Sequence, residues 1–501
     1  MPQPALRLTG APLSISDVVS VARHGRAVRL APSTKVAILR SRRVVEDSLT
    51  DGEAHYGINT GFGSLSRQRI NADQVRELQQ NLIRSHAAGV CELLPTDVVR
   101  GMLLLLAASL SRGLSGVRPA LVEAVIGLLN AGVTPCVPSV GSVGASGDLA
   151  PLAAAGLVLL GEGEAEFEGR RMPGGRALER AGLQPLELHA KEGLAIINGT
   201  HLMASSAALL LADAELWFDA AVLAAAMSID AVKGTDSFLD KRLHAARRQP
   251  GQIGVAARLL ELLKGSTIIP SHREDDPRVQ DPYSLRCTPQ VLGAAWDCLS
   301  YVKSAVEREL GAVTDNPLVL GRDIVSGGNF HGMPLAIPLD ALALSIAAVA
   351  GISERRVFWM LSSFDKEAGL RPYLSPKPGL HSGLMIAQYT AAACCNEIIG
   401  LATPASAANI PTSAEVEDYN SFGPRAAAKA RRALQLATSV IAIELLCAAE
   451  GVEHHRPLRS GVVVERAIAR IRHVVPPLKA DRPPTPDIGA ISGLITAGQL
   501  T

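Results

Sequence analysis

The chain has 501 residues, of which 48% are hydrophobic and only 3% aromatic. This length and apolar content allow a large buried core and predict more than one domain. Lysine and arginine (49) balance aspartate and glutamate (48), so the net charge is +1. Because the chain has no long basic block, nucleic acid and anionic membranes are poor candidates as partners.

Cysteine and hydropathy patterns indicate a cytoplasmic protein. The 7 cysteines form no C-x-x-C pair, so neither a disulfide framework nor a metal site is indicated. The start of the chain lacks the apolar region of a secretory signal. The longest apolar runs, such as 342–352, are too short to cross a bilayer and are typical of buried helices.

Helical patterns dominate the chain from about residue 96 onward. In 96–116 leucines recur on one face, and the helix expected next lies between Pro119 and Gly132, which are typical first and last residues. Further helices are expected in alanine-rich stretches at 203–227, 335–363, 385–408 and 425–450. Strand-like alternation is scarce. Helices that are apolar around most of their circumference are buried in a large protein or between subunits, which predicts an oligomer.

Polar, glycine-rich loops separate these helices and are the expected location of function. They span 55–70, 136–151, 265–288, 314–334 and 409–424. The segment 162–182 predicts a small hairpin or surface excursion, and the proline-rich stretch from Val474 to Gly489 is expected to end regular helix.

The loop "GSVGASGDLAP" (141–151) is the most permissive backbone in the chain. A phosphate-binding loop would need a following G-K-[ST], and a nucleophile elbow would need one more residue around Ser146. A tight turn into a helix, with Asp148 near the positive helix end, is the simplest interpretation. A third interpretation is that the Gly147 nitrogen attacks the Ala145 carbonyl carbon, and that loss of water and of the Ser146 hydroxyl gives a methylidene-imidazolone electrophile.

The third interpretation is favoured by a resemblance that covers nearly the whole chain. "GSVGASGDLAPLA" closely resembles the signature of the aromatic amino acid ammonia-lyase family, in which Ala-Ser-Gly matures into this electrophile. Other stretches resemble family motifs in the same order: "HYGINTGFGSL" (55–65), "NLIRSHAAG" (81–89), "INGTH" (197–201), "QDPYSLRCTPQ" (280–290), "TDNPLV" (314–319), "SGGNFHG" (326–332) and "DRPPTPDI" (481–488).

The resemblance implies a mainly all-α fold, a long-helix bundle of the histidase/fumarase-like type. We expect residues 1–200 to form a smaller N-terminal domain with the electrophile loop and the tyrosine loop, and residues 201–501 to form the long-helix bundle. The implied cofactor is 4-methylidene-imidazol-5-one (MIO), made from Ala145, Ser146 and Gly147 without an external cofactor or metal. The implied partners are a small amino acid substrate and further copies of the chain, as a homotetramer whose subunits complete each other's sites.

The same resemblance assigns roles to residues in the other loops. Tyr56 is the expected general base, although an ordinary tyrosine pKa of about 10 requires an electropositive environment for that role. Arg286 resembles the clamp for the substrate carboxylate, which its planar fork suits. Tyr283 resembles a second catalytic tyrosine. Taken alone, Tyr56 would be a packed turn residue and Arg286 the partner of the acidic residues just upstream.

Three further residues are expected to shape the site. Gln280 and Asn198 resemble polar groups that position the substrate and the oxygen of the electrophile, and Phe330 resembles an aromatic residue packed beside it. In isolation, Gln280 and Asn198 would be loop hydrogen-bonding residues and Phe330 an ordinary core residue.

Two positions bear on the substrate. The pair Ser85-His86 matches the histidine-specific branch of the family, and a histidine can hydrogen-bond a substrate imidazole. Glu417 stands where this branch has a glutamate and the phenylalanine branch a glutamine. The structural alternatives are a satisfied core histidine and a carboxylate at a helix start. Met385 also resembles the histidine branch and argues against ergothioneine as substrate.

Three residues depart from the histidine branch: Val416, Tyr419 and Met333. The matches at Ser85-His86 and Glu417 nevertheless predict non-oxidative elimination of ammonia from L-histidine to give trans-urocanate. A tyrosine or phenylalanine ammonia-lyase, or an aminomutase with the same electrophile, remains the alternative.

Overall fold

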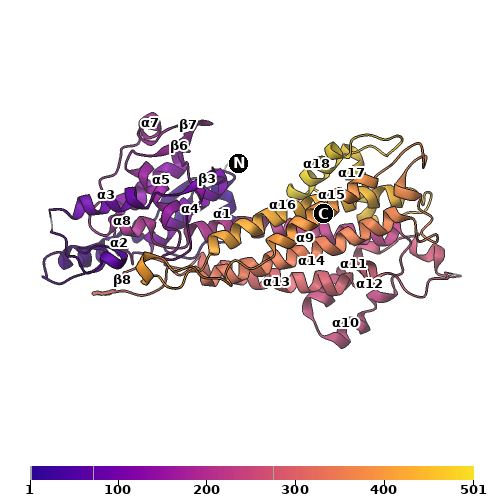
Figure 1. Ribbon diagram of the computed structural model, residues 1–501, viewed down its shortest axis with the longest axis horizontal. Coiled ribbons are helices and arrows are strands. Elements are labelled where there is room, and N and C mark those ends of the chain that lie inside the picture. Colours follow the sequence, from indigo (N-terminus) through magenta and orange to yellow (C-terminus); the bar gives the residue numbers. More distant parts are fainter. Residues whose placement is uncertain (1–2, 72, 275, 501) are drawn as a thin grey trace. The chain divides into compact units, whose positions relative to one another are not determined.

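The computed structural model describes residues 3–71, 73–274 and 276–500, which form two compact units (Figure 1). The first unit contains Met1–Ala212, Lys303–Leu339 and Pro404–Ala428, and the second contains Asp213–Val302, Asp340–Thr403 and Lys429–Thr501. The expected division into 1–200 and 201–501 differs from these units. The chain returns to the first unit twice after leaving it, each time with a glycine-rich or polar loop.

The first unit consists of helices and small sheets of two or three strands. Its helices are α1 (Ile15–Ala22), α2 (Pro32–Ser48), η1 (Gly63–Leu65), α3 (Val75–His86), α4 (Thr96–Ser111), α5 (Pro119–Ala131), α6 (Leu149–Leu159), α7 (Gly174–Arg180), α8 (Glu192–Ile197) and η5 (Ser413–Glu415). Its strands are β1 (Leu6–Leu8), β2 (Val28–Leu30), β3 (Val90–Leu93), β4 (Thr134–Pro135), β5 (Pro138–Val140), β6 (Glu164–Phe167), β7 (Arg170–Pro173), β8 (Leu318–Leu320) and β9 (Asp323–Val325).

The sheets are local and serve mainly to fasten loops. Strand β1 pairs with β2 in parallel, whereas β3–β5, β4–β6–β7 and β8–β9 pair antiparallel. The hairpin β6–β7 confirms the small hairpin predicted within 162–182. Strand β5 leads directly into the loop 141–148, so its pairing with β3 fixes where that loop begins.

The second unit is built from helices. It holds parts of α9 (His201–Ala231), α13 (Thr288–Glu309), α14 (Met333–Ser362) and α16 (Gly423–Glu453), and these four helices also contribute residues to the first unit. Its other helices are η2 (Ser237–Leu239), α10 (Lys241–Arg247), α11 (Pro250–Leu263), η3 (Ile269–His272), α12 (Tyr283–Arg286), η4 (Pro372–Leu374), α15 (Met385–Leu401), α17 (Val462–Val474) and α18 (Pro484–Thr496).

The predicted helix signals explain most of these boundaries. Pro119 is the first residue of α5, and Gly132 ends it in the left-handed conformation with φ 75°. Alanine-rich α9 and α16 form because alanine has the highest helix propensity and lets neighbouring helices approach. The proline-rich segment does end a regular helix, since α17 ends at Val474, but a further helix that was not expected, α18, begins inside the segment at Pro484, where a proline needs no N–H donor.

A buried ion pair fixes the packing of the long helices in the second unit. Arg356 on α14 and Glu444 on α16 are fully buried, and an Arg356 guanidinium nitrogen lies 3.0 Å from a Glu444 oxygen. Glu444 also accepts a hydrogen bond from Ser228 of α9 at 2.7 Å. Charges at this depth are stable only with their full set of partners, so this cluster specifies how α9, α14 and α16 align.

Two helices are longer than the apolar segments that the sequence predicts. Met333–Ser362 and Gly423–Glu453 are long and apolar enough to cross a membrane, contrary to the expectation that no run would be. In Gly423–Glu453, 83% of the most apolar window is buried inside the protein. The apolar character comes from dispersed alanines and leucines rather than from one continuous run, as in the core helices of globular proteins.

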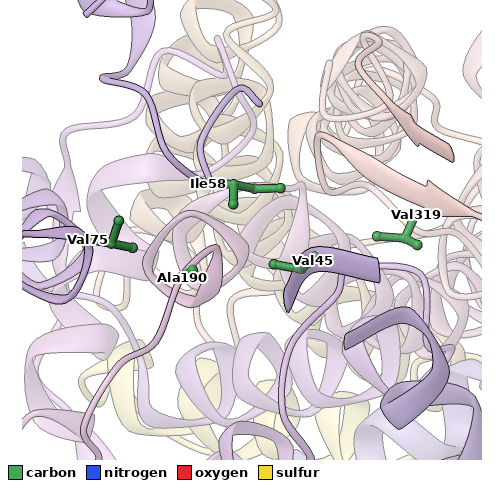
Figure 2. Close-up of a cluster of buried hydrophobic side chains, with 5 residues drawn as sticks. All are labelled: Val45, Ile58, Val75, Ala190 and Val319. Carbon is green, nitrogen blue, oxygen red and sulfur yellow. The ribbon is translucent and has the colours of Figure 1, made fainter. Parts of the chain in front are cut away.

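A small hydrophobic cluster supports the tyrosine loop of the first unit. Figure 2 shows its members, which come from α2, the tyrosine loop, α3, the segment before α8, and β8: Val45, Ile58, Val75, Ala190 and Val319. Ile58 is fully buried, only two residues after Tyr56. Burial of this side chain therefore anchors a loop that has almost no regular structure of its own.

Candidate active site

Loops of the first unit and helix α3 line a cavity of about 760 Å³. Seven predicted site residues line it: Tyr56, His86, Ala145, Ser146, Asn198, Phe330 and Glu417. They come from segments that are far apart in the sequence. A concave site with converging polar groups of this size is typical of a small-molecule site.

The backbone of the Ala145-Ser146-Gly147 loop is held by the segment 198–200. The Gly199 amide donates to the Ser146 carbonyl at 3.1 Å, and the Asp148 amide donates to the Gly199 carbonyl at 2.7 Å. Gly147 has φ 78°, and a Cβ there would lie 2.1 Å from the Gly199 oxygen. Only glycine fits this position, so the nitrogen that the cyclisation requires belongs to a residue without a side chain.

Helix N-termini converge on this loop. Helix α6 begins at Leu149 and α9 at His201, on either side of the Gly147–Gly199 backbone bridge. Next to Gly423, where α16 begins, the Phe422 amide donates to the Val143 carbonyl at 2.9 Å. Unpaired N–H groups and helix dipoles make such a point electropositive, which favours electrons or anions that accumulate there.

Asp148 precedes α6, as the sequence predicted, but its side chain serves a different helix. It is fully buried and accepts from the Leu202 amide at 2.8 Å and the Met203 amide at 3.1 Å, in the first turn of α9. Burial raises the pKa of this carboxyl to about 7. Asp148 therefore joins α6 to α9 directly behind the Ala-Ser-Gly loop.

Tyr56 lies in the cavity wall on a turn packed against α8. Its hydroxyl accepts from the Gly63 amide at 3.3 Å, and its ring packs edge-on against Phe62. Burial raises the pKa of Tyr56, and the Glu417 charge raises it further. A base at neutral pH needs a lowered pKa instead. Tyr56 therefore needs a nearby positive charge, and the negative Glu417 acts in the opposite sense.

The tautomer of His86 follows from its hydrogen bonds. His86 is the last residue of α3, and its Nδ1 lies 2.9 Å from the Leu82 carbonyl oxygen. Nδ1 also lies 3.0 Å from the Ser85 hydroxyl oxygen, which can accept a hydrogen bond too. Because the Leu82 carbonyl can only accept, its contact assigns the proton to Nδ1 and leaves Nε2 with a free lone pair. Burial lowers the pKa of His86, which keeps the ring neutral. The structure thus provides a hydrogen-bond acceptor at this side of the cavity.

Glu417 stands on a strained loop. The residues before it, Ser413, Ala414 and Glu415, all have positive φ, a costly conformation for residues other than glycine that is typical of functional sites. The Thr412 hydroxyl donates to a Glu417 carboxylate oxygen at 2.8 Å. Sequence reasoning missed Thr412, since nothing in its local pattern reports a contact five residues away.

Two of the three residues that depart from the histidine branch line the cavity, and the third begins a helix. Val416 and Tyr419 line the cavity, and the Tyr419 ring stacks on His331 with centroids 6.4 Å apart. Met333 begins α14, and its amide hydrogen-bonds the His331 Nδ1 at 3.3 Å. His331 therefore contacts two of the three departures, Tyr419 and Met333. Sequence reasoning did not single out His331.

Three predicted residues lie in the second unit. Gln280, Tyr283 and Arg286 line a separate hollow there, beside Trp359 and Phe364. The Arg286 guanidinium lies over the Tyr283 ring at 4.5 Å, and its Nε donates to the Asp281 carbonyl at 3.0 Å. Tyr283 is 70% exposed. None of these three residues is among those that line the cavity of the first unit.

Arg286 has no ion pair with the acidic residues upstream in the described part of the chain. One of them, Asp276, binds Arg278 instead, with 2.7 Å between Arg278 Nη2 and the carboxylate. Asp275 lies outside the described residues. The guanidinium of Arg286 thus keeps donors free on the surface that Tyr283 also occupies.

A model of the aromatic amino acid lyase family matches residues 13–473, and the chain belongs to this family. A curated histidine ammonia-lyase from Deinococcus radiodurans is 47% identical over 490 residues, which cover 97% of this chain and 93% of the relative. The crystal structure of a histidine ammonia-lyase from Trypanosoma cruzi has a TM-score of 0.91 at 36% identity and covers 99% of this chain and 94% of that one. A tyrosine aminomutase from Streptomyces globisporus has a TM-score of 0.93 at 32% identity, with 99% and 97% covered. These findings confirm the resemblance and the mainly helical fold.

Proposed function

We propose that this protein is an ammonia-lyase that converts L-histidine to trans-urocanate and ammonia. The observation that carries the choice of substrate is the tautomer of His86: its free Nε2 accepts a hydrogen bond, and the N–H of a substrate imidazole donates one. A phenyl ring has no donor and would leave Nε2 unpaired. The curated histidine ammonia-lyases that match the full chain support the same substrate.

The proposed cofactor is MIO, formed from Ala145, Ser146 and Gly147. Three observations favour it: the close approach of Gly147 to Gly199, the glycine flanks that permit a tight bend, and the helix N-termini aimed at the loop. When formed, this group supplies an electrophile that no ordinary side chain provides. Phe330 lines the same cavity and would shield the loop from water.

Tyr56 is the proposed base for the β-proton of the substrate. It acts from the same cavity wall, within the field of Glu417, which raises its pKa. A positive charge is needed to counter this effect when substrate is bound. Glu417 itself is placed to pair with the substrate imidazole or with the ammonium that leaves.

The missing positive charge is proposed to come from another copy of the chain. A homotetramer would place Gln280, Tyr283 and Arg286 of neighbouring subunits at the cavity of the first unit. Arg286 would then bind the substrate carboxylate through its free donors and lower the pKa of Tyr56. The exposed Tyr283 and the apolar helices of the second unit support this assembly.

We place the enzyme in the cytoplasm, because its cysteines are all free.

A tyrosine-specific lyase or aminomutase is the second candidate. The phenol of tyrosine also carries a donor for His86 Nε2, and Val416 and Tyr419 change the cavity wall at the loop that bears Glu417. The aminomutase structures share the fold at TM-scores of 0.92 and 0.93. Phenylalanine is less favoured, since its ring leaves His86 without a partner.

Product analysis tests the function directly. The purified protein is incubated separately with L-histidine, L-tyrosine and L-phenylalanine, while ammonia and the ultraviolet absorbance of the product are followed. We expect ammonia and urocanate from L-histidine alone. A β-amino acid product, or turnover of L-tyrosine instead, would overturn the proposal in favour of the second candidate. Intact-protein mass tests the cofactor separately, since MIO formation removes one water on ring closure and another with the Ser146 hydroxyl.

A further inference from the structure

A buried ion pair lies directly behind the cavity wall. Lys191 Nζ and Asp315 Oδ2 are 2.7 Å apart, and the two side chains are 1% and 2% exposed. Burial lowers the pKa of Lys191, which measures the cost of keeping an ammonium at this depth. Such a pair contributes little to stability compared with apolar residues of the same shape, so its presence calls for another role.

The second carboxylate oxygen of Asp315 is bound to a residue of the site. Asn198 Nδ2 donates to Asp315 Oδ1 at 3.2 Å and to the Asn316 carbonyl at 2.9 Å. These two bonds use both amide hydrogens of Asn198. Asp315 Oδ1 is itself held by the Asn316 amide at 2.7 Å, so it cannot move away.

This arrangement permits one orientation of the Asn198 amide. Turned by 180°, its oxygen would face two acceptors, Asp315 Oδ1 and the Asn316 carbonyl, with no hydrogen between them. In the permitted orientation Asn198 Oδ1 is buried and has no partner in the described part of the chain, although Asn198 lines the cavity. A buried acceptor without a partner costs free energy until a donor arrives.

We propose that the Lys191–Asp315 pair is a positioning device that presents the Asn198 side-chain oxygen to the ammonium group of the substrate. Lys191 holds the Asp315 carboxylate in place through the 2.7 Å ion pair, Asp315 holds the amide hydrogens, and the oxygen is left for an N–H donor. A protonated amine fits this acceptor, whereas the carbonyl oxygen of an electrophile does not, because two acceptors repel. The inference rests on the proposed function only in taking an amino acid as the ligand.

Binding to a protein that cannot turn over substrate tests the inference. In the Ser146→Ala background, calorimetry compares L-histidine with 3-(imidazol-4-yl)propionate, which has the same ring and carboxylate but no amine. Asp315→Asn gives Asn198 a donor as neighbour and so allows its amide to turn. We expect the dissociation constant of L-histidine to rise roughly tenfold or more, and that of the amine-free ligand to stay within about twofold.

A second buried pair provides the matched control. Lys429 Nζ and Asp340 Oδ1 are 3.1 Å apart and both side chains are 5% exposed, but neither residue lines the cavity. Asp340→Asn is expected to leave both ligands unaffected. Equal weakening of both ligands by Asp315→Asn, or the same pattern from Asp340→Asn, would show that the pair is merely structural and would overturn the inference.

A double-mutant cycle shows whether Asp315 acts through Asn198. Asn198→Ala should produce the same selective loss, and Asp315→Asn should add nothing to it. If Asp315→Asn fails to fold, the double variant Lys191→Met/Asp315→Leu replaces the pair by apolar side chains and predicts the same selective loss. Additive losses in the cycle would contradict the inference.

The ring of the ligand separates this inference from the proposed function. If the Ser146→Ala protein binds L-tyrosine but not L-histidine, the choice of substrate is wrong, and the comparison is repeated with L-tyrosine and 3-(4-hydroxyphenyl)propionate. The inference then stands or falls on the amine alone. If the Ser146→Ala protein with Asp315 intact binds the amino acid and its amine-free analogue equally tightly, the inference is overturned, even if the wild-type enzyme deaminates L-histidine.

Discussion

The two units of the protein differ in structure: the first holds a cavity lined largely by loops, and the second is a core of packed helices. The first unit builds a cavity from loops whose backbone is held by glycine contacts, positive φ angles and buried polar bonds, as at Gly147 and Asn198. The second unit is a helical core whose order comes from apolar packing and from the Arg356–Glu444 pair. The residues that line the cavity of the first unit differ from the buried ion pair of the second unit, so we expect substitutions in the cavity to change chemistry and substitutions in the ion pair to change stability.

The largest effect on chemistry is expected from Ser146→Ala. Without the hydroxyl the loop cannot mature, and ammonia release should fall by roughly a thousandfold or more, as for the loss of other reacting groups. The thermal midpoint should stay near that of the wild type, because Ser146 is only partly buried and donates no bond that holds the loop. Steady-state kinetics and calorimetric unfolding check both halves. Retained turnover in this variant would refute the assignment of the electrophile.

Tyr56→Phe sharpens the same contrast and adds a pH dependence. Because the pKa of Tyr56 is raised above its ordinary value of 10, the phenolate fraction grows about tenfold per pH unit from neutrality into the alkaline range. The wild-type kcat/KM should therefore rise with pH, and Tyr56→Phe should lower it by about 10²–10⁴-fold and flatten this rise. The intact mass must still show the mature electrophile. A variant that keeps the wild-type pH profile would exclude Tyr56 as the base.

Glu444→Gln is the corresponding experiment on the helical core. Removing one charge leaves Arg356 buried without its counter-ion, which should cost about 3–5 kcal/mol of unfolding free energy. Glu397→Gln is the matched control, because its pair with Arg432 is about half exposed and should contribute little to stability. Urea unfolding measures both. Equal losses in the two variants would contradict the distinction between core and surface pairs.

His86→Leu is expected to have the smallest effect and to separate substrates rather than abolish activity. Loss of one hydrogen bond should lower kcat/KM for L-histidine by about 10- to 100-fold and leave any weak turnover of L-phenylalanine unchanged or improved. In the wild type, binding of L-histidine should weaken as the pH falls through the His86 pKa, which burial holds below 6.5, since protonation removes the Nε2 lone pair. An unchanged substrate preference would exclude His86 from ring recognition.

Local patterns predicted the helices because the causes of helix formation are local, whereas the lining residues were predicted from the resemblance of the motifs to a family. Alanine content and the proline and glycine at the ends of α5 specify helices without help from distant residues. The Ala145-Ser146-Gly147 loop, Tyr56 and His86 were predicted from the resemblance of their motifs to a family, because the residues alone favoured a turn, a packed tyrosine and a core histidine. All of them but Gly147 line one cavity, and Gly147 pairs with Gly199. Their catalytic roles remain predictions that the experiments above test.

Long-range contacts could not be predicted in this way. Asp148 was expected to serve the helix that follows it, yet its carboxyl binds the amides of α9, more than fifty residues later. The division of the chain was also not local, because 303–339 and 404–428 return to the first unit. Hydropathy and propensity describe a residue and its neighbours in the chain, and neither reports which distant loop will face it.

The amino-acid sequence alone therefore determined that long helices dominate the fold, and its motifs predicted which tripeptide could cyclise and which side chains could act as base, clamp and ring partner. The tertiary structure decided their electrostatic state. It set the tautomer of His86 through Leu82, raised the pKa of Tyr56 by burial, and directed an Asn198 amide hydrogen to Asp315, which leaves the Asn198 oxygen without a partner among the described residues. These properties depend on distance and burial, which arise only when segments far apart in the chain are packed together.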